Sequence, residues 1–298
     1  MKRFMKYLLP VIIALASLVS CAKETLNPDS VIIADEVEKN QFDNWLDYNF
    51  TGPYNIDFKY RFEMNESDMN YYTVPADYRQ SIILAHLVKY LCVDTYDEVA
   101  GIDFTRAYFP KMFFLIGEWE YRNNGTIILG TAEGGKKILL TGVNYLISYM
   151  SYGAEVLNEY YIKTIHHEFT HILNQTKPLP TDFQLVNGEG YVGDSWSEEP
   201  YDAEYLSRGF ISAYAQHSDV EDFAETVSIY ITNTPEFWES QLDEAGSGAE
   251  LIMTKLDIAK NYYRNSWGFE LDDLRNTILR RQDDVLNGKI DLESLEIK

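Results

Sequence analysis

The stretch TIHHEFTH, residues 164–171, contains three of the five histidines of the chain and one glutamate. His167, Glu168 and His171 fit the pattern H-E-x-x-H. On an α-helix, residues four positions apart lie about 40° apart around the axis and ~6 Å apart along it, so both imidazoles can bind one zinc ion. Glu168 would lie beside them and could deprotonate a water molecule held by the metal. His166 has no histidine four positions later, and we expect it to be a neighbour of the site and not a ligand.

A catalytic zinc ion also needs a third protein ligand and an open position for water. Metzincins use a histidine six positions after the second histidine, but Lys177 occupies that position here, so this class is excluded. Downstream, the stretch 212–231 (SAYAQHSDVEDFAETVSIYI) has apolar residues at helical spacing, which places Glu221 and Glu225 together on one flank. We therefore predict Glu221 as the third ligand and Glu225, one turn later, as a carboxylate that orients an imidazole N–H.

The same spacing assigns the other residues of the helix predicted at 212–231. Two glutamates on a helix usually mark a solvated face, and only their combination with H-E-x-x-H favours a metal site. Asp222 is expected on the opposite, solvated side. His217 is expected at the surface, and its alternative roles are metal ligand or transition-state donor. The expected buried stripe consists of Val220, Phe223, Ala224, Val227 and Ile231.

The order of these residues resembles a known group of enzymes. H-E-F-x-H, followed by Tyr-x6-Glu-x-F-A-Glu at 214–225, is similar to the gluzincin metallopeptidases and to the protease domain of anthrax lethal factor in particular. This resemblance implies a zincin-like fold, a Zn²⁺ cofactor and a peptide or protein substrate. It also implies that Tyr214 donates its phenol proton to the oxyanion that develops on the substrate. The match to lethal factor is confined to the two predicted helices and Tyr214.

The first twenty residues differ from the rest of the chain. Three basic residues precede an apolar stretch at 8–19, which is shorter than the ~20 residues of a membrane span but suits an export signal. The stretch leads into Leu-Val-Ser-Cys, which resembles a bacterial lipobox and implies cleavage before Cys21 and lipidation of this residue. An ordinary secretory signal or a short anchor helix is the alternative.

These observations define the expected domain organisation. Residues 1–20 form a lipoprotein signal peptide, the polar and acidic residues 21–45 form a lipidated tether, and residues 46–298 form one zincin-like metallohydrolase domain. The hydrophobic content of 46% is enough for a buried core. Cys21 and Cys92 are the only cysteines, so lipidation of the first leaves no intrachain disulfide, and Cys92 is expected in the core.

With the lipobox in front, the whole chain resembles the substrate import-associated zinc metallohydrolase lipoproteins of Bacteroidota. This resemblance implies an outer-membrane lipoprotein, at the cell surface or on the periplasmic face. The partners that it implies are a TonB-dependent receptor and a SusD-like lipoprotein. The formal charge of −22 argues against nucleic acid as a partner, because a polyanion would have to approach a negative surface.

The elements around the motifs predict an α+β fold. Alternating apolar residues at 54–62 predict a half-buried strand, and helical spacing at 77–92 predicts an amphipathic helix. Apolar segments separated by glycine-rich turns at 111–142 predict a meander or a small mixed sheet. The segment 178–204, rich in Gly, Pro, Ser and Asp, is expected to be a long loop that covers the site. Residues 250–285 are expected to add a final helical layer.

Three functions are compatible with the sequence. The first is a lipid-anchored zinc peptidase, in which Glu168 takes a proton from zinc-bound water. By the gluzincin resemblance, an edge strand formed by TIILGTA or KILLTG would bind an extended peptide. The second is a non-catalytic substrate-binding lipoprotein of a TonB/SusD-type uptake complex with a structural or vestigial zinc site, favoured by the 23 tyrosines and five tryptophans. The third is zinc-dependent hydrolysis of a non-peptide amide.

Overall fold

The computed structural model describes residues 38–68, 70–122, 125–133 and 135–297. The predicted signal peptide, the predicted lipidation site Cys21 and most of the predicted tether lie outside these residues. A folded unit begins at Asn40. The prediction that the tether extends to residue 45 is wrong, because helix α2 (Gln41–Leu46) buries Phe42 and Trp45 in the core.

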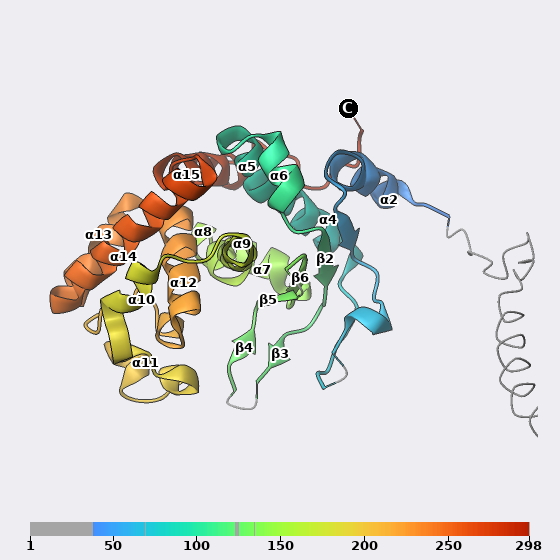
Figure 1. Ribbon diagram of the computed structural model, residues 1–298. Helices are drawn as coiled ribbons and strands as arrows, with labels where there is room; N and C mark the ends of the chain where they lie inside the picture. The colour runs from blue at the N-terminus through green and yellow to red at the C-terminus, as the bar shows by residue number, and fades with distance from the viewer. Residues whose placement is uncertain (1–37, 69, 123–124, 134, 298) are drawn as a thin grey trace, which may run out of the picture. The chain divides into compact units, whose positions relative to one another are not determined.

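A four-stranded mixed sheet forms in the first half of the folded unit (Figure 1). Its strand order is β1-β2-β6-β5. Strands β1, β2 and β6 are parallel, and β5 runs antiparallel to β6 at one edge. The predicted small mixed sheet is therefore confirmed. The strands are β1 (Asp57–Lys59), β2 (Met112–Leu115), β5 (Gly130–Glu133) and β6 (Lys137–Leu140).

Strand β1 is shorter than the alternation at 54–62 predicts. Ile56, Phe58 and Tyr60 are buried as expected, but Phe62 is 37% exposed and only the three residues of β1 pair with β2. The alternation identifies the buried face correctly. The length of the strand depends on the partner strand, which a local pattern does not specify.

Two further strands form a separate hairpin. Strand β3 (Glu120–Tyr121) pairs antiparallel with β4 (Ile127–Ile128), and Figure 1 shows this hairpin extending away from the four-stranded sheet. Leu129 alone separates β4 from the edge strand β5. The hairpin and the edge of the sheet are therefore neighbours in both sequence and space.

Short helices precede, separate and follow the strands of the sheet along the chain. The helix predicted at 77–92 is confirmed and is longer than expected, because α4 continues through a π-helical turn (Val88–Val93) into α5. Its residues His86 and Cys92 are buried, as predicted for Cys92. Besides α2, the α-helices described before the H-E-x-x-H helix are α3 (Gly52–Tyr54), α4 (Tyr78–Leu87), α5 (Asp94–Val99), α6 (Ile102–Tyr108), α7 (Leu146–Met150) and α8 (Ala154–Leu157).

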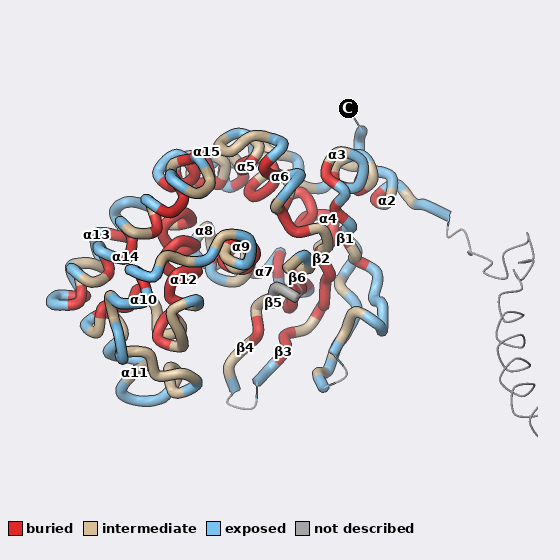
Figure 2. Tube along the Cα trace, in the orientation of Figure 1, coloured by how far each residue is buried: buried red, intermediate tan, exposed pale blue. Residues whose placement is uncertain are grey.

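Helix α9 (Lys163–Thr176) carries the H-E-x-x-H motif and ends just before Lys177, as predicted. Its inner face is fixed to the core by Phe169, whose ring centroid lies 4.8 Å from that of Tyr96 and 4.9 Å from that of Phe109. Each such aromatic pair contributes about 0.5–1.5 kcal/mol beyond the burial of its area. Figure 2 shows buried residues along this helix, so the position of the motif is set by the core.

The segment 178–204 is not the extended loop that its composition predicts. It contains α10 (Thr181–Asn187), short 3-10 turns and α11 (Tyr201–Glu204), and Phe183 of α10 is fully buried. Gly and Pro divide the segment into pieces but leave room for helices of one or two turns. The helix predicted at 212–231 begins later than expected, as α12 (Asp219–Thr232), after a 3-10 turn at Tyr214–Gln216.

The predicted final helical layer is confirmed. It consists of α14 and α15, preceded by α13, and α12 packs against α9, α14 and α15. Helix α12 is therefore covered by neighbours on more than one side (Figure 2). Among the residues that the structure describes, no helix is long and apolar enough to span a membrane. The bounds of the layer are α13 (Pro235–Ala245), α14 (Ala249–Tyr262) and α15 (Leu271–Leu286).

Candidate metal centre

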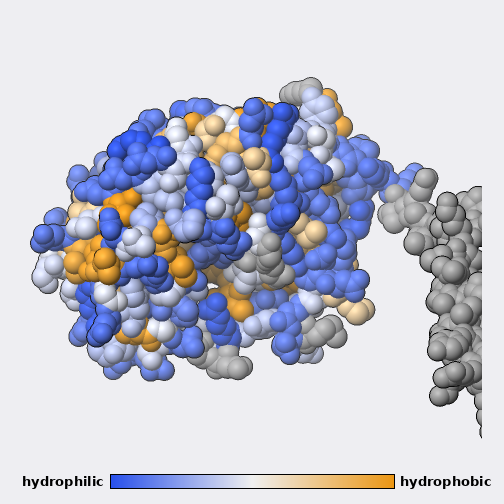
Figure 3. Space-filling view, viewed as in Figure 1, coloured by the Kyte–Doolittle hydropathy of each residue, from blue (hydrophilic) through white to orange (hydrophobic). Residues whose placement is uncertain are grey.

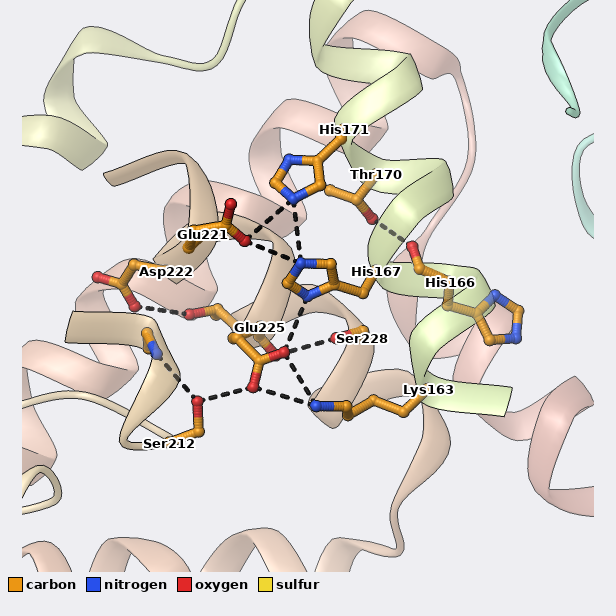
Figure 4. Close-up of polar contacts among 12 residues, drawn as sticks. Lys163, His166, His167, Thr170, His171, Ser212, Glu221, Asp222, Glu225 and Ser228 are labelled. Carbon is orange, nitrogen blue, oxygen red and sulfur yellow. Dashed lines mark hydrogen bonds and ion pairs between the residues drawn. The ribbon is translucent and has the colours of Figure 1, made fainter. Parts of the chain in front are cut away.

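The three predicted metal ligands meet between α9 and α12 (Figure 4). Nε2 of His167 lies 3.0 Å from Oε2 of Glu221, and Nε2 of His171 lies 3.1 Å from the same oxygen. The two Nε2 atoms are 3.0 Å apart. The fold thus brings Glu221 to a histidine that lies 50 positions earlier in the chain. We call these three side chains the ligand triangle.

The ligand triangle fits a zinc ion. Ligand atoms about 2.0–2.1 Å from a tetrahedral Zn²⁺ stand roughly 3.3–3.4 Å apart, which is close to the sides of the triangle. Hydrogen bonds to Glu221 alone do not explain the convergence, because two N–H groups that both donated to its oxygen would crowd their protons between Nε2 atoms only 3.0 Å apart. Two imidazoles and a carboxylate are also the donor set of known catalytic zinc sites. We conclude that these residues could hold Zn²⁺.

Glu225 holds the other side of the His167 ring, as predicted. Its Oε1 lies 2.8 Å from Nδ1 of His167, so this carboxylate pairs with the Nδ1 side of the ring and Nε2 faces the ligand triangle. Nζ of Lys163 lies 3.0 Å from Glu225, and the hydroxyl of Ser212 donates a hydrogen bond to it at 2.7 Å (Figure 4). The Glu225 side chain is 2% exposed, so these contacts fix both the carboxylate and the imidazole.

The carboxylates of the site stabilise positive charge. Burial acts to raise the pKa of Glu221, but hydrogen bonds from His167 and His171 hold it well below its usual range. Burial also acts to raise the pKa of Glu225, which Lys163 and His167 keep low. In the opposite sense, burial acts to lower the pKa of His167, but Glu221 and Glu225 raise it to about 10. The pocket therefore favours a cation, and a divalent metal ion meets this requirement.

Glu168 and Tyr214 border the same centre. Glu168 lines the cleft next to the ligand triangle, and no described residue donates a hydrogen bond to its carboxylate. The ring centroid of Tyr214 lies 6.1 Å from that of His167. Burial and the charge of Glu221 raise the pKa of Tyr214, so its phenol keeps its proton and can donate a hydrogen bond.

The two other histidines of interest lie outside the ligand triangle. His166 points to the opposite side of α9 (Figure 4), where its Nδ1 is 3.1 Å from the hydroxyl of Tyr96. Burial lowers the pKa of His166 to about 3, so the imidazole is neutral. His217 pairs with Asp194 at 3.4 Å, and its side chain is 35% exposed. These positions agree with the prediction of a neighbour for His166 and of a surface residue for His217.

The predicted environment of Asp222 is wrong. Its side chain is fully buried, with Oδ2 at 2.7 Å from Nζ of Lys255 and 3.0 Å from the hydroxyl of Tyr191. Val220, which was expected in the buried stripe, is 41% exposed. The prediction assumed a helix with one buried face. Helix α12 instead packs against both α9 and α14, and every residue from Asp222 to Thr232 is buried.

A cleft borders the ligand triangle. Figure 3 shows a mostly hydrophilic surface in which apolar residues appear in a hollow beside β4. One side of the cleft has the apolar residues Ile127, Leu129 and Trp196 in its wall, and the other side has the polar residues Thr131, Asn174 and Gln175. The residues that line both sides are Arg122, Gly130, Glu168 and Tyr214.

Strand β5 forms one wall of this cleft. It lies at the edge of the sheet and belongs to TIILGTA, whereas KILLTG supplies the interior strand β6. Of the two edge strands considered from the sequence, the structure selects the first. Gly130 allows β5 to approach α9 closely, because a Cβ atom there would lie 2.7 Å from Cγ2 of Thr164.

Four residues of the site were missed in the sequence analysis. Lys163 precedes His167 by one helical turn, so its place on the same face of α9 could have been predicted from spacing. Ser212 and Arg122 lie in irregular segments and Trp196 lies in a short 3-10 helix (Gly193–Ser197), and no local sequence pattern specifies their positions.

A mixed sheet followed by helices, with two histidines of H-E-x-x-H and a later glutamate converging beside a cleft, is the arrangement of a zinc metallopeptidase. The chain belongs to the family described as "Putative zinc-binding metallo-peptidase", whose model matches residues 35–272. It is similar to a solved structure described as a "putative zinc-binding metallo-peptidase from Bacteroides caccae ATCC 43185", with 40% sequence identity and a TM-score of 0.73. The match covers 90% of this chain and 100% of that one. No curated protein matches the chain.

Proposed function

We propose that the protein is a zinc-dependent peptidase that hydrolyses peptide bonds in the cleft beside β5 and α9. The observation that carries this proposal is the convergence of His167, His171 and Glu221 at a cleft. The carboxylate of Glu168 lines this cleft and accepts no hydrogen bond from the described residues. A zinc ion with three protein ligands acts as a Lewis acid and lowers the pKa of a bound water to about 7.

Each residue around the ligand triangle has a role in this proposal. Glu168 accepts a proton from the attacking water and passes it to the departing amine. Tyr214 donates its phenol hydrogen bond to the oxyanion of the substrate, a role taken from the lethal factor resemblance and supported by its distance from His167. Glu225 keeps the His167 ring in one orientation. Strand β5 offers its outer edge to an extended peptide.

A hydrolase fits the site better than a structural zinc site does. Structural zinc ions usually have four protein ligands, whereas the cluster found among the described residues has three. The ligand triangle borders the cleft that Glu168 and Tyr214 line, so a zinc ion held there would be accessible to a substrate. These two features favour the peptidase over the binding-protein alternative.

The test is a cleavage profile of proteome-derived peptides, run with and without a chelator. We expect cleavage that stops on chelation and returns with zinc. Glu168→Gln should keep one zinc per chain, measured by elemental analysis, and lose about 10²–10⁴-fold in rate. Glu239→Gln, an exposed residue of α13, is the matched control and should keep full activity. Unchanged turnover in Glu168→Gln would remove Glu168 from the mechanism. If the protein cleaves only amides that are not peptides, the proposal would change to a non-peptide substrate.

We also propose that the protein is exported and anchored by a lipid at Cys21 in the outer membrane, next to an uptake system of the TonB/SusD type. The support for this is the lipobox-like sequence and the resemblance to import-associated lipoproteins. Cys21→Ser should move the protein from the membrane fraction to the soluble fraction of cells. A membrane fraction that is unchanged in this variant would contradict the lipid anchor.

A further inference from the structure

Arg122 follows strand β3 and reaches into the cleft. It lines the apolar side and the polar side alike, and its guanidinium carbon lies 5.9 Å from the ring centroid of Tyr214. The ring of Tyr214 is in turn 6.1 Å from that of His167. Arg122 is therefore close to the ligand triangle without belonging to it.

Arg122 differs from most other exposed arginines in its partners. Arg106 is exposed too, but its Nε donates a hydrogen bond to the carbonyl of Pro53 and it does not line the cleft. Within the described part of the chain, no carboxylate lies within ion-pair distance of its guanidinium, although the protein has 47 acidic residues and 25 basic ones. Its side-chain hydrogen-bond partner is Tyr214, and because no described carboxylate neutralises its charge, Arg122 is available for an anion from outside. The exposed arginines that do hold carboxylates are Arg61 with Asp43, Arg79 with Glu293, Arg264 with Glu270 and Arg280 with Glu98.

The other cation of the cleft is not available in the same way. Lys163 lines the apolar side, but its Nζ lies 3.0 Å and 3.2 Å from the two oxygens of Glu225. The remaining charged residues of the cleft wall are the carboxylates Glu168 and Glu221, which would repel an anion. An anionic group of a substrate would therefore be stabilised at Arg122 and disfavoured beside the glutamates.

We propose that Arg122 binds a carboxylate of the peptide substrate, which is either an acidic side chain or the C-terminal carboxylate. This inference rests on the proposed peptidase function. The planar guanidinium can hold a carboxylate through two parallel hydrogen bonds. The two ring distances above place the guanidinium carbon within about 12 Å of the His167 ring centroid, which corresponds to about four residues of extended peptide at ~3.3–3.6 Å per residue.

The kinetic test uses peptides from the cleavage profile in matched pairs. In one set, Glu replaces Gln at each of four positions on either side of the cleaved bond, with an amidated C-terminus. In the other set, neutral peptides are shortened so that they end at one of the same positions, and each is made with a free and with an amidated C-terminus. We expect one of the two sets to show a preference for the carboxylate of about 10–100-fold in kcat/KM, and the set that does so identifies its source.

Variants of Arg122 assign this preference to the side chain. Arg122→Gln should bring the kcat/KM ratio within each peptide pair close to one, mainly through KM. Arg122→Lys should keep part of the preference, because the positive charge remains but the planar guanidinium with its two parallel donors is lost. Arg79→Gln removes the same charge from a distant exposed position and should keep the full preference. A carboxylate preference that survives Arg122→Gln, or its absence from the wild-type protein, would overturn the inference and leave the peptidase proposal intact.

A binding measurement separates this inference from the proposed reaction. The Glu168→Gln variant is titrated calorimetrically with the same peptide pairs. The double variant Glu168→Gln with Arg122→Gln is titrated in the same way. Selective binding of the carboxylate peptides that is lost in the double variant supports Arg122, even if the wild-type protein cleaves no peptide. Equal binding of both members of each pair contradicts it, whatever the turnover.

Discussion

Helix α12 presents carboxylates to two different neighbours. Toward α9, Glu221 meets two imidazoles at the border of a cleft, with its side chain 17% exposed. Toward α14, Asp222 meets Lys255 in an interior where the two side chains are 0% and 1% exposed. The residues are adjacent in sequence, but the source of positive charge differs. Lys255 belongs to the chain, whereas the ligand triangle needs a cation from outside.

The pKa values of these carboxylates show the same contrast. Burial raises the pKa of Asp222 to about 6, and Lys255 only partly opposes this. The pKa of Glu221 stays well below its usual range despite burial, because two imidazoles donate to it. A buried acid paired with one ammonium group is mainly a structural element with a large desolvation cost. Burial of an acid is thus a poor sign of function, and access to a cleft is a better one.

The largest effect is expected from Glu221→Ala, which breaks the ligand triangle. Zinc content should fall from about one per chain to near zero, and the rate should fall by more than about 10³-fold, because a catalytic metal stabilises the transition state by several kcal/mol. The unfolding free energy of the metal-free protein should change by less than about 1 kcal/mol. Elemental analysis and urea denaturation measure the two effects, and full zinc content in the variant would exclude Glu221 as a ligand.

The next effect is expected from Lys255→Met, which breaks the interior pair. The unfolding free energy should fall by about 3–5 kcal/mol, because Asp222 is left buried without its partner. Zinc affinity of the folded variant should stay unchanged, measured by chelator competition. Replacing both partners, as Asp222→Leu with Lys255→Met, should recover most of the stability. If zinc affinity falls in both the single and the double variant, the Asp222–Lys255 pair and the ligand triangle are coupled.

The smallest effect is expected from Glu225→Gln, which keeps the shape of the site and removes one charge. Zinc affinity should weaken by about 10–100-fold, because the His167 ring loses a strong acceptor. Ser212→Ala removes a single hydrogen bond to the same carboxylate and should weaken the affinity less. If the two variants bind zinc as tightly as the wild-type protein, Glu225 supports the fold only.

The residues of one helical turn were predictable, while those that depend on tertiary packing were not. His167 and His171 face one point because their spacing on a helix fixes their geometry. Glu221 was identified only through its flank of a second predicted helix, in combination with the H-E-x-x-H motif. The error at Asp222 has the opposite cause, because a periodic pattern cannot reveal that a second neighbour covers the polar side of α12.

The fold follows the same division. Helix α9, the mixed sheet and the final helices have strong local patterns and were predicted. The start of the folded unit at α2 was missed, since Phe42 and Trp45 lie in an acidic stretch that suggests a tether. The short helices α10 and α11 were missed because their composition is that of a loop.

The anchoring of α9 from behind has a practical consequence. Phe169 packs into an aromatic cluster, and the hydroxyls of Thr170 and Tyr263 are 3.1 Å apart, so the helix is held in place by contacts that do not involve the ligand triangle. The donor atoms of the ligand triangle should then keep their arrangement when a metal ion is repeatedly removed and rebound. Cobalt(II) could replace zinc in such a preformed cage, and its visible absorption would report the coordination geometry directly.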